Sequence, residues 1–228
     1  MQYERLTQPP SPVLQVDQLS FCQIQLELVR YATLAAIGHN TQPWQFSLEL
    51  DSILILPDHD RRLTAVDLDQ HHFYASFGFA IENMVQAVPA FGYHATPRFE
   101  PSLDFIWISL EKAPVFLSQL FQEIPQRQST RSPYDKKSVS PEHLKLLAEA
   151  GNAIGVRMLF FTERKEIDGI LPYLISGNSA QMNDPHFIAE LKKRDGLFSK
   201  CSGSWMLPEW LGRLMFSLQA TALGIRFA

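Results

Sequence analysis

The feature that most constrains this chain is the stretch over residues 71–93, HHFYASFGFAIENMVQAVPAFGY. Read as a helix, it is apolar on most of its sides rather than along one stripe. A helix of that kind is stable only where other elements cover it. We therefore expect a buried central helix, with the rest of the chain built around it.

Composition supports a globular protein. The chain has 228 residues, of which 46% are hydrophobic, 11% aromatic and 19% charged, which is enough to bury a substantial core. No stretch approaches the roughly 20 uninterrupted apolar residues of a spanning helix, so we expect a soluble protein without a membrane partner.

Charge and cysteine content narrow the function classes. Twenty Lys and Arg against 24 Asp and Glu give a net charge of −4 without a basic run, which argues against nucleic-acid binding. Cys22 and Cys201 are too few for a disulfide framework and lack metal-ligand spacing. The N-terminus has no apolar signal segment, so we expect a cytoplasmic protein.

The first half of the fold is expected over residues 16–112, after a proline-rich N-terminal arm over residues 1–15. Helical and alternating periodicities predict its elements. They are a helix over 16–38 that stops at Gly38, a hairpin over 46–57, the central helix, and strands at 96–99 and 105–110.

The second half is expected over residues 113–228. Its predicted elements are helices at 114–122, 141–150, 167–175 and 185–193, a strand at 156–161, and a last helix that ends at Gly224. Ser140 is the expected N-cap of the helix that starts at Pro141. Both halves run helix, strand, helix, which favours an α+β fold made of a duplicated unit.

The segment RQSTR places Arg127, Ser129 and Arg131 at alternate positions. In an extended chain these three side chains project to one side, where two guanidinium groups and a hydroxyl can hold a phosphate. The alternative is a solvated basic linker, which the spacing by itself favours.

The segment HNTQ, residues 39–42, forms a compact polar loop between an apolar helix and a strand, followed by Pro43 and Trp44. Its amide groups suit the carbonyl and nitrogen edge of a planar ring such as a flavin. The alternative is an ordinary capping turn.

Together the two segments resemble one family. LAAIGHNTQPWQF is similar to the SxxNxQPW signature of FMN-dependent nitroreductases, and RQSTRSPYD is similar to their RxSxR phosphate motif. The order of the two motifs, with HHFYASFGFAIEN between them, resembles the fused, Acg-like branch of that family. This resemblance implies two nitroreductase-like halves with mixed β-sheets packed by helices, an intrachain pseudo-dimer that forms a monomer or a homodimer.

The resemblance also implies site residues and an activity. Arg127, Ser129 and Arg131 would hold the phosphate of one FMN, and His39, Asn40 and Gln42 would contact its ring; no catalytic side chain or metal is implied. The implied activity transfers a hydride from NADH or NADPH through FMN to a small-molecule acceptor, such as a nitroaromatic or a quinone. The alternative is a non-catalytic protein that binds or sequesters flavin.

Three other features carry further hypotheses. His71 and His72, with Asp67 and Asp69, are more consistent with a helix start than with a metal site. Residues 195–210, which contain Cys201, form either a lid over the flavin or a plain surface loop. The resemblance further implies segments that are missing between Met215 and Phe216 and after Ala228.

Overall fold

The computed structural model describes residues 18–129, 134–135, 137–152 and 155–192, and its fold is α+β. The chain divides into two compact units, one of residues 1–127 and 186–228 and one of residues 128–185. The second unit is therefore an insertion in the sequence of the first. No helix in the described ranges is both long and apolar enough to cross a membrane.

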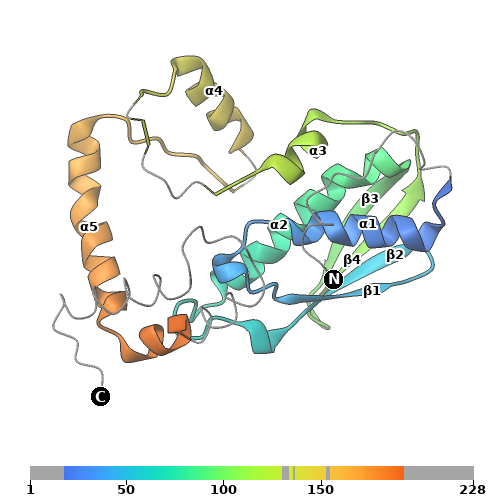
Figure 1. Cartoon of the computed structure of the whole chain (residues 1–228), viewed down its shortest axis with the longest axis horizontal. Helices are drawn as coiled ribbons and strands as arrows, with labels where there is room; N and C mark the ends of the chain where they lie inside the picture. Colours follow the sequence, from blue (N-terminus) through green and yellow to red (C-terminus); the bar gives the residue numbers. More distant parts are fainter. Residues whose placement is uncertain (1–17, 130–133, 136, 153–154, 193–228) are drawn as a thin grey trace. The chain divides into compact units, whose positions relative to one another are not determined.

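The first unit contains a four-stranded sheet in the order β1-β2-β4-β3 (Figure 1). Its strands are β1 (Trp44–Leu48), β2 (Ser52–Pro57), β3 (Tyr93–Glu100) and β4 (Phe105–Lys112). The predicted β1–β2 hairpin is confirmed. All neighbours pair antiparallel, so the expected mixed sheet is wrong for these strands. The reason is topological: two hairpins supply the sheet, and the crossover through α2 joins β2 to β3, which lie on either side of β4.

Helices α1 (Phe21–Thr33) and α2 (His71–Ala87) lie side by side on one face of this sheet (Figure 1). Beneath them Ile53, Ile55 and Ile108 are fully buried. The central helix expected from the sequence is thus present. Only one of its faces is buried, however, because Phe79 on another face remains 53% exposed.

Helix α1 is shorter at both ends than the predicted 16–38. It begins at Phe21 because Ser20 and Gln23 form a capping box, in which the Ser20 amide donates to Gln23 Oε1 at 2.8 Å. It ends at Thr33, five residues before Gly38, where side chains from other parts of the first unit take over its last carbonyl groups. Helix α3 (Gln119–Glu123) is likewise shorter than the predicted 114–122.

The second unit contains α4 (Pro141–Ala150) and α5 (Arg164–Met182). Ser140 caps α4 as predicted, since its Oγ accepts from the His143 amide at 3.3 Å. The strand predicted at 156–161 is wrong: only Val156 makes an isolated bridge, and Leu159 is 57% exposed. An apolar run forms a strand only beside a hydrogen-bonding neighbour, and among residues 156–161 only Val156 is bridged to one.

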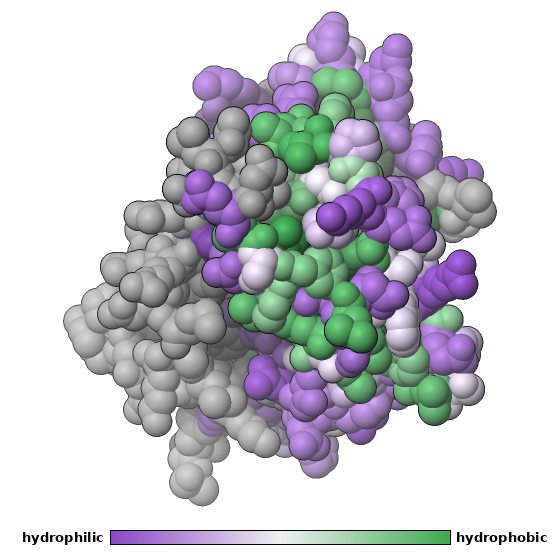
Figure 2. Space-filling view, turned by 90° about the vertical axis from the view of Figure 1, so that its right-hand side faces the viewer, coloured by the Kyte–Doolittle hydropathy of each residue, from purple (hydrophilic) through white to green (hydrophobic). Residues whose placement is uncertain are grey.

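Residues 185–192 are helical, as predicted for 185–193, and residues 186–192 of this segment belong to the first unit. Glu190 on this segment binds the first unit's loop after β2: its carboxylate accepts from the Thr64 and Ala65 amides at 2.8 and 2.9 Å. Exposed apolar side chains remain on the molecule, and Figure 2 shows them gathered in the middle of one face among hydrophilic residues.

Candidate functional site

The candidate site is built around the C-terminal end of α1. The last carbonyl groups of a helix have no partner within it and carry the negative end of its dipole. Here three side chains from other elements donate to them: Asn83 to Tyr31 O at 3.2 Å, Gln42 to Thr33 O at 3.0 Å, and Arg127 to Leu34 O at 3.1 Å. This end of α1 therefore gathers residues that are far apart in the sequence.

Tyr31 packs this helix end into the core. Its ring is 3% exposed and packs against Phe121 and Phe91, with ring centroids 5.0 and 6.2 Å apart. Burial raises the pKa of the Tyr31 hydroxyl to about 12, and the nearby Arg30 charge only partly opposes this effect. The aromatic packing fixes the carbonyl groups to which the three donors bind.

The loop that follows α1 is conformationally unusual. It contains a single 3-10 turn, η3 (Gly38–Asn40), and then Asn40 and Gln42 adopt left-handed backbone angles, with φ of 47° and 50°. Such a conformation costs about 1–2 kcal/mol for most residues other than glycine, whereas asparagine tolerates it better, so the main cost falls on Gln42. A costly residue in a short loop is a reason to look for function there.

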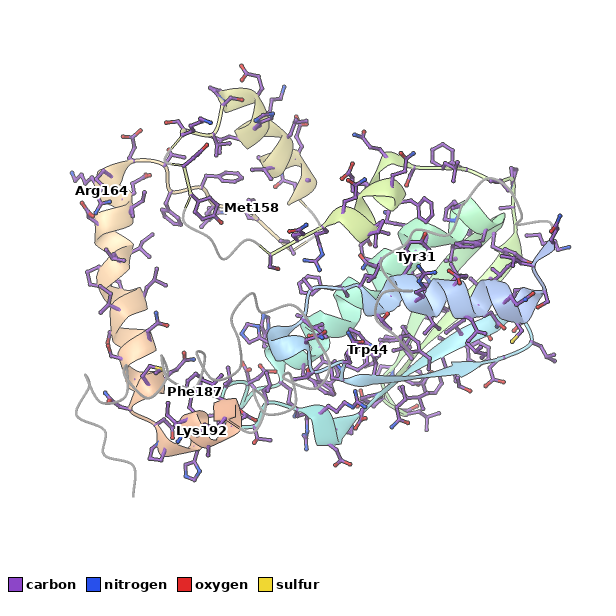
Figure 3. The ribbon with its side chains drawn as sticks, viewed as in Figure 1. Tyr31, Trp44, Met158, Arg164, Phe187 and Lys192 are labelled. Atoms are coloured by element: carbon purple, nitrogen blue, oxygen red, sulfur yellow. The ribbon has the colours of Figure 1, made fainter. Side chains whose placement is uncertain are left out.

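Side-chain hydrogen bonds and packing hold the loop in this shape. The Gln42 amide donates to Asn40 Oδ1 at 3.0 Å as well as to Thr33 O. Pro43 and Trp44 are buried at the start of β1, and the Trp44 ring lies 6.1 Å from that of Phe77. Figure 3 labels Tyr31 and Trp44, which stand on either side of this loop in the sequence.

A further residue, Arg61, binds the loop from outside. It lies in the 3-10 turn η4 (His59–Arg61), and its Nη1 donates to Gln42 O at 3.2 Å and to Thr41 O at 3.4 Å. Sequence analysis missed Arg61. The feature that could have revealed Arg61 was the predicted hairpin. Its register pairs Trp44 with Pro57, so residues after β2 lie beside residues before β1.

The depression beside the loop is small. It has a volume of about 20 Å³, and its lining includes Gly38, Thr41, Leu63 and Phe73. A space of this size admits one or two water molecules. In the described part of the chain, a planar ligand would therefore lie over the edge of the loop and not in an enclosed pocket.

The predicted flavin-site residues fall into three groups. Asn40, Gln42 and Arg127 meet at the end of α1, and His39 is the middle residue of η3. Ser129 is described and exposed, in the second unit. Arg131 lies outside the described residues. Of the three residues predicted to bind the phosphate, Arg127 is thus brought to the loop that is predicted to bind the ring.

The residues considered for a metal cap a helix instead. Asp67 is buried, and its carboxylate accepts from the His72 and Phe73 amides at 2.9 and 2.7 Å. Asp69 accepts from the His71 amide at 3.1 Å. Across the described ranges, no three His, Cys, Asp or Glu side chains are grouped to hold a metal ion.

Several predictions fall on residues that the structure does not describe. They are the N-terminal arm at 1–15, the lid at 195–210, Cys201, the helix that ends at Gly224, and the break between Met215 and Phe216.

Comparison with known proteins adds nothing to this picture, since no family model and no curated protein matches the chain.

Proposed function

We propose that this chain is an FMN-dependent oxidoreductase of the nitroreductase type, which passes a hydride from NADH or NADPH to a nitroaromatic, a quinone or a related acceptor. The observation that carries the proposal is the meeting of two motifs. Arg127 of the RQSTR motif donates to Leu34 O, 93 residues earlier, at the helix end where Gln42 of the HNTQ motif also binds. Two motifs that were present by chance would not be expected to lie at the same helix end.

The residues present suit FMN. A guanidinium group is a strong partner for a phosphate, because its planar fork donates two charge-assisted hydrogen bonds. Both donors of Gln42 Nε2 are engaged, with Thr33 O and Asn40 Oδ1, so the side-chain groups that the loop can offer to the polar edge of the ring are Asn40 Nδ2 and Gln42 Oε1. When bound, FMN supplies the hydride-accepting and hydride-donating chemistry.

The chain's own contribution is binding and orientation. Asn40 and Gln42 orient the ring, and His39 lies on the same loop as the middle residue of η3. The phosphate is bound by Arg127, Ser129 and Arg131. No side chain is proposed as a nucleophile or as an acid–base catalyst. The proposal includes the fold that the resemblance implies, with two nitroreductase-like halves fused as a pseudo-dimer.

The test is turnover by the full chain loaded with FMN. NADH and NADPH are each supplied in turn with a nitroaromatic or a quinone, and nucleotide oxidation is followed by absorbance. Steady oxidation that depends on both protein and acceptor supports the proposal. Tight FMN binding without oxidation would favour the non-catalytic flavin-binding protein, and absence of FMN binding would overturn both.

A further inference from the structure

We propose that Arg61 is a positioning residue for the flavin, which holds the loop over residues 38–43 so that the backbone N–H of Gln42 is presented to the ring of FMN. The inference rests on the proposed function and assigns a role that neither motif contains. It depends on hydrogen bonds, backbone angles and peptide geometry within the first unit.

Arg61 is attached to the loop at two successive carbonyl groups. Its Nη1 donates to Gln42 O at 3.2 Å and to Thr41 O at 3.4 Å. Its Nε pairs with Asp58 Oδ2 at 3.0 Å, and the Asp58 amide donates to Pro43 O at 2.9 Å. Arg61 and Asp58 thus form a brace that links the end of β2 to three consecutive residues of the loop.

The brace binds the part of the loop whose backbone conformation is least favourable by itself. Gln42 has a φ of 50°, and Asn40, two residues earlier, has a φ of 47°. Residues of this kind keep a left-handed backbone only where the surroundings impose it. Because Arg61 binds the carbonyl groups on both sides of the Gln42 Cα, it imposes that conformation directly.

The same contacts fix the direction of an N–H group. A trans peptide is planar, so the C=O of Thr41 and the N–H of Gln42 point in opposite directions. Since the C=O of Thr41 faces Arg61, the N–H of Gln42 faces away from Arg61. Within the ranges that the structure describes, this N–H donates no hydrogen bond. The next residue is Pro43, which has no N–H, so Gln42 provides the last donor of the loop.

The experiment compares Arg61→Ala and Arg61→Lys with the parent chain, using FMN as the probe. Arg98→Ala is the matched control, because Arg98 is an exposed arginine of β3 that does not bind the loop. For each protein, FMN affinity is measured by fluorescence titration, and the reduction potential of bound FMN is measured at saturating FMN. Far-UV circular dichroism verifies folding.

We expect Arg61→Ala to weaken FMN binding at least tenfold and to shift the reduction potential of the flavin that still binds, because hydrogen bonds to the ring tune that potential. Arg61→Lys keeps the charge but loses the fork, so we expect an intermediate effect. Arg98→Ala should match the parent in both measurements. If Arg61→Ala fails to fold, the affinity and potential of Arg61→Lys decide the test.

Two outcomes would overturn the inference while leaving the proposed function intact. One is a parent that binds FMN and Arg61 variants that bind it within twofold. The other is a loss of affinity with an unchanged potential, which would show that Arg61 stabilises the fold without positioning the loop for the ring. A parent that does not bind FMN would instead overturn the proposed function.

Discussion

The guanidinium group of Arg127 donates a hydrogen bond from Nη2 to the carbonyl oxygen of Leu34, at 3.1 Å and across 93 residues of sequence. This bond places a cation at the negative end of the α1 dipole. It also links the start of the RQSTR motif to Leu34, which lies between α1 and the loop over residues 38–43.

The first prediction concerns this residue. Arg127→Ala removes a charge-assisted phosphate contact of about 1.5–3 kcal/mol, so FMN affinity should fall by about tenfold to a hundredfold. Because Arg127 is exposed, thermal stability should change little. Fluorescence titration with FMN and a melting curve measure the two effects, with Arg98→Ala as the charge control. Unchanged affinity would mean that Arg127 only caps α1.

The second prediction concerns alkaline stability. The pKa of Tyr31 is raised to about 12 in the fold, against an ordinary value of 10.0. Tyr31 therefore contributes stability that is fully present below pH 10 and is lost as the pH rises towards 12, because the unfolded chain releases the proton first. The free energy of unfolding should fall by at most about 3 kcal/mol over this range on this account. Tyr31→Phe should remove that part of the pH dependence, and denaturant unfolding at pH 9 and pH 11 measures it.

The third prediction concerns the start of α2. Asp67→Ala leaves the His72 and Phe73 amides without their acceptor, so the free energy of unfolding should fall by about 1–2 kcal/mol. Asp67→Asn keeps one acceptor oxygen and should cost less. Asp69→Ala is the matched control, since within the described ranges Asp69 accepts a hydrogen bond only from the His71 amide, and it is exposed. Urea unfolding compares the variants, and equal losses for Asp67→Ala and Asp69→Ala would contradict the assigned cap.

The fourth prediction concerns the entry to β3. Gly92 follows the 3-10 turn η5 (Val88–Phe91) with a φ of +76°, and a Cβ there would lie 3.3 Å from Val115 Cγ2. Gly92→Ala should therefore destabilise the fold by about 1–2 kcal/mol. Gly78→Ala is the control: Gly78 is a helical position in α2 with nothing within 4 Å of the added carbon, so this variant should stabilise or be neutral. A lower melting temperature for Gly92→Ala and an unchanged or higher one for Gly78→Ala would bear this out, and equal decreases would contradict it.

Local patterns predicted the elements that depend on local chemistry. The turn between residues 48 and 52 and the alternation around it predicted the β1–β2 hairpin, and Ser140 with Pro141 predicted the start of α4. The strand predicted at 156–161 is wrong because an apolar run says nothing about whether a neighbouring strand exists. The predicted end of α1 was wrong for a related reason: the side chains of Gln42, nine residues after Thr33, and of Arg127, 93 residues after Leu34, replace the bonds that a longer helix would make.

The candidate site was predictable only in part. Asn40 and Gln42 could be selected because amides between an apolar helix and a strand are conspicuous in a sequence. Their left-handed backbone and the brace from Arg61 could not, because both depend on the register of β1 against β2. Asp67 was noticed as a possible ligand, whereas its carboxylate caps α2.

The measurement that tests the account most directly is the stoichiometry of FMN binding to the full chain. Isothermal titration calorimetry gives the number of sites, and absorbance of flavin released by denaturation verifies it. The account predicts one FMN per chain, because a single HNTQ loop is paired with a single RQSTR motif. Two FMN per chain, or none, would contradict it.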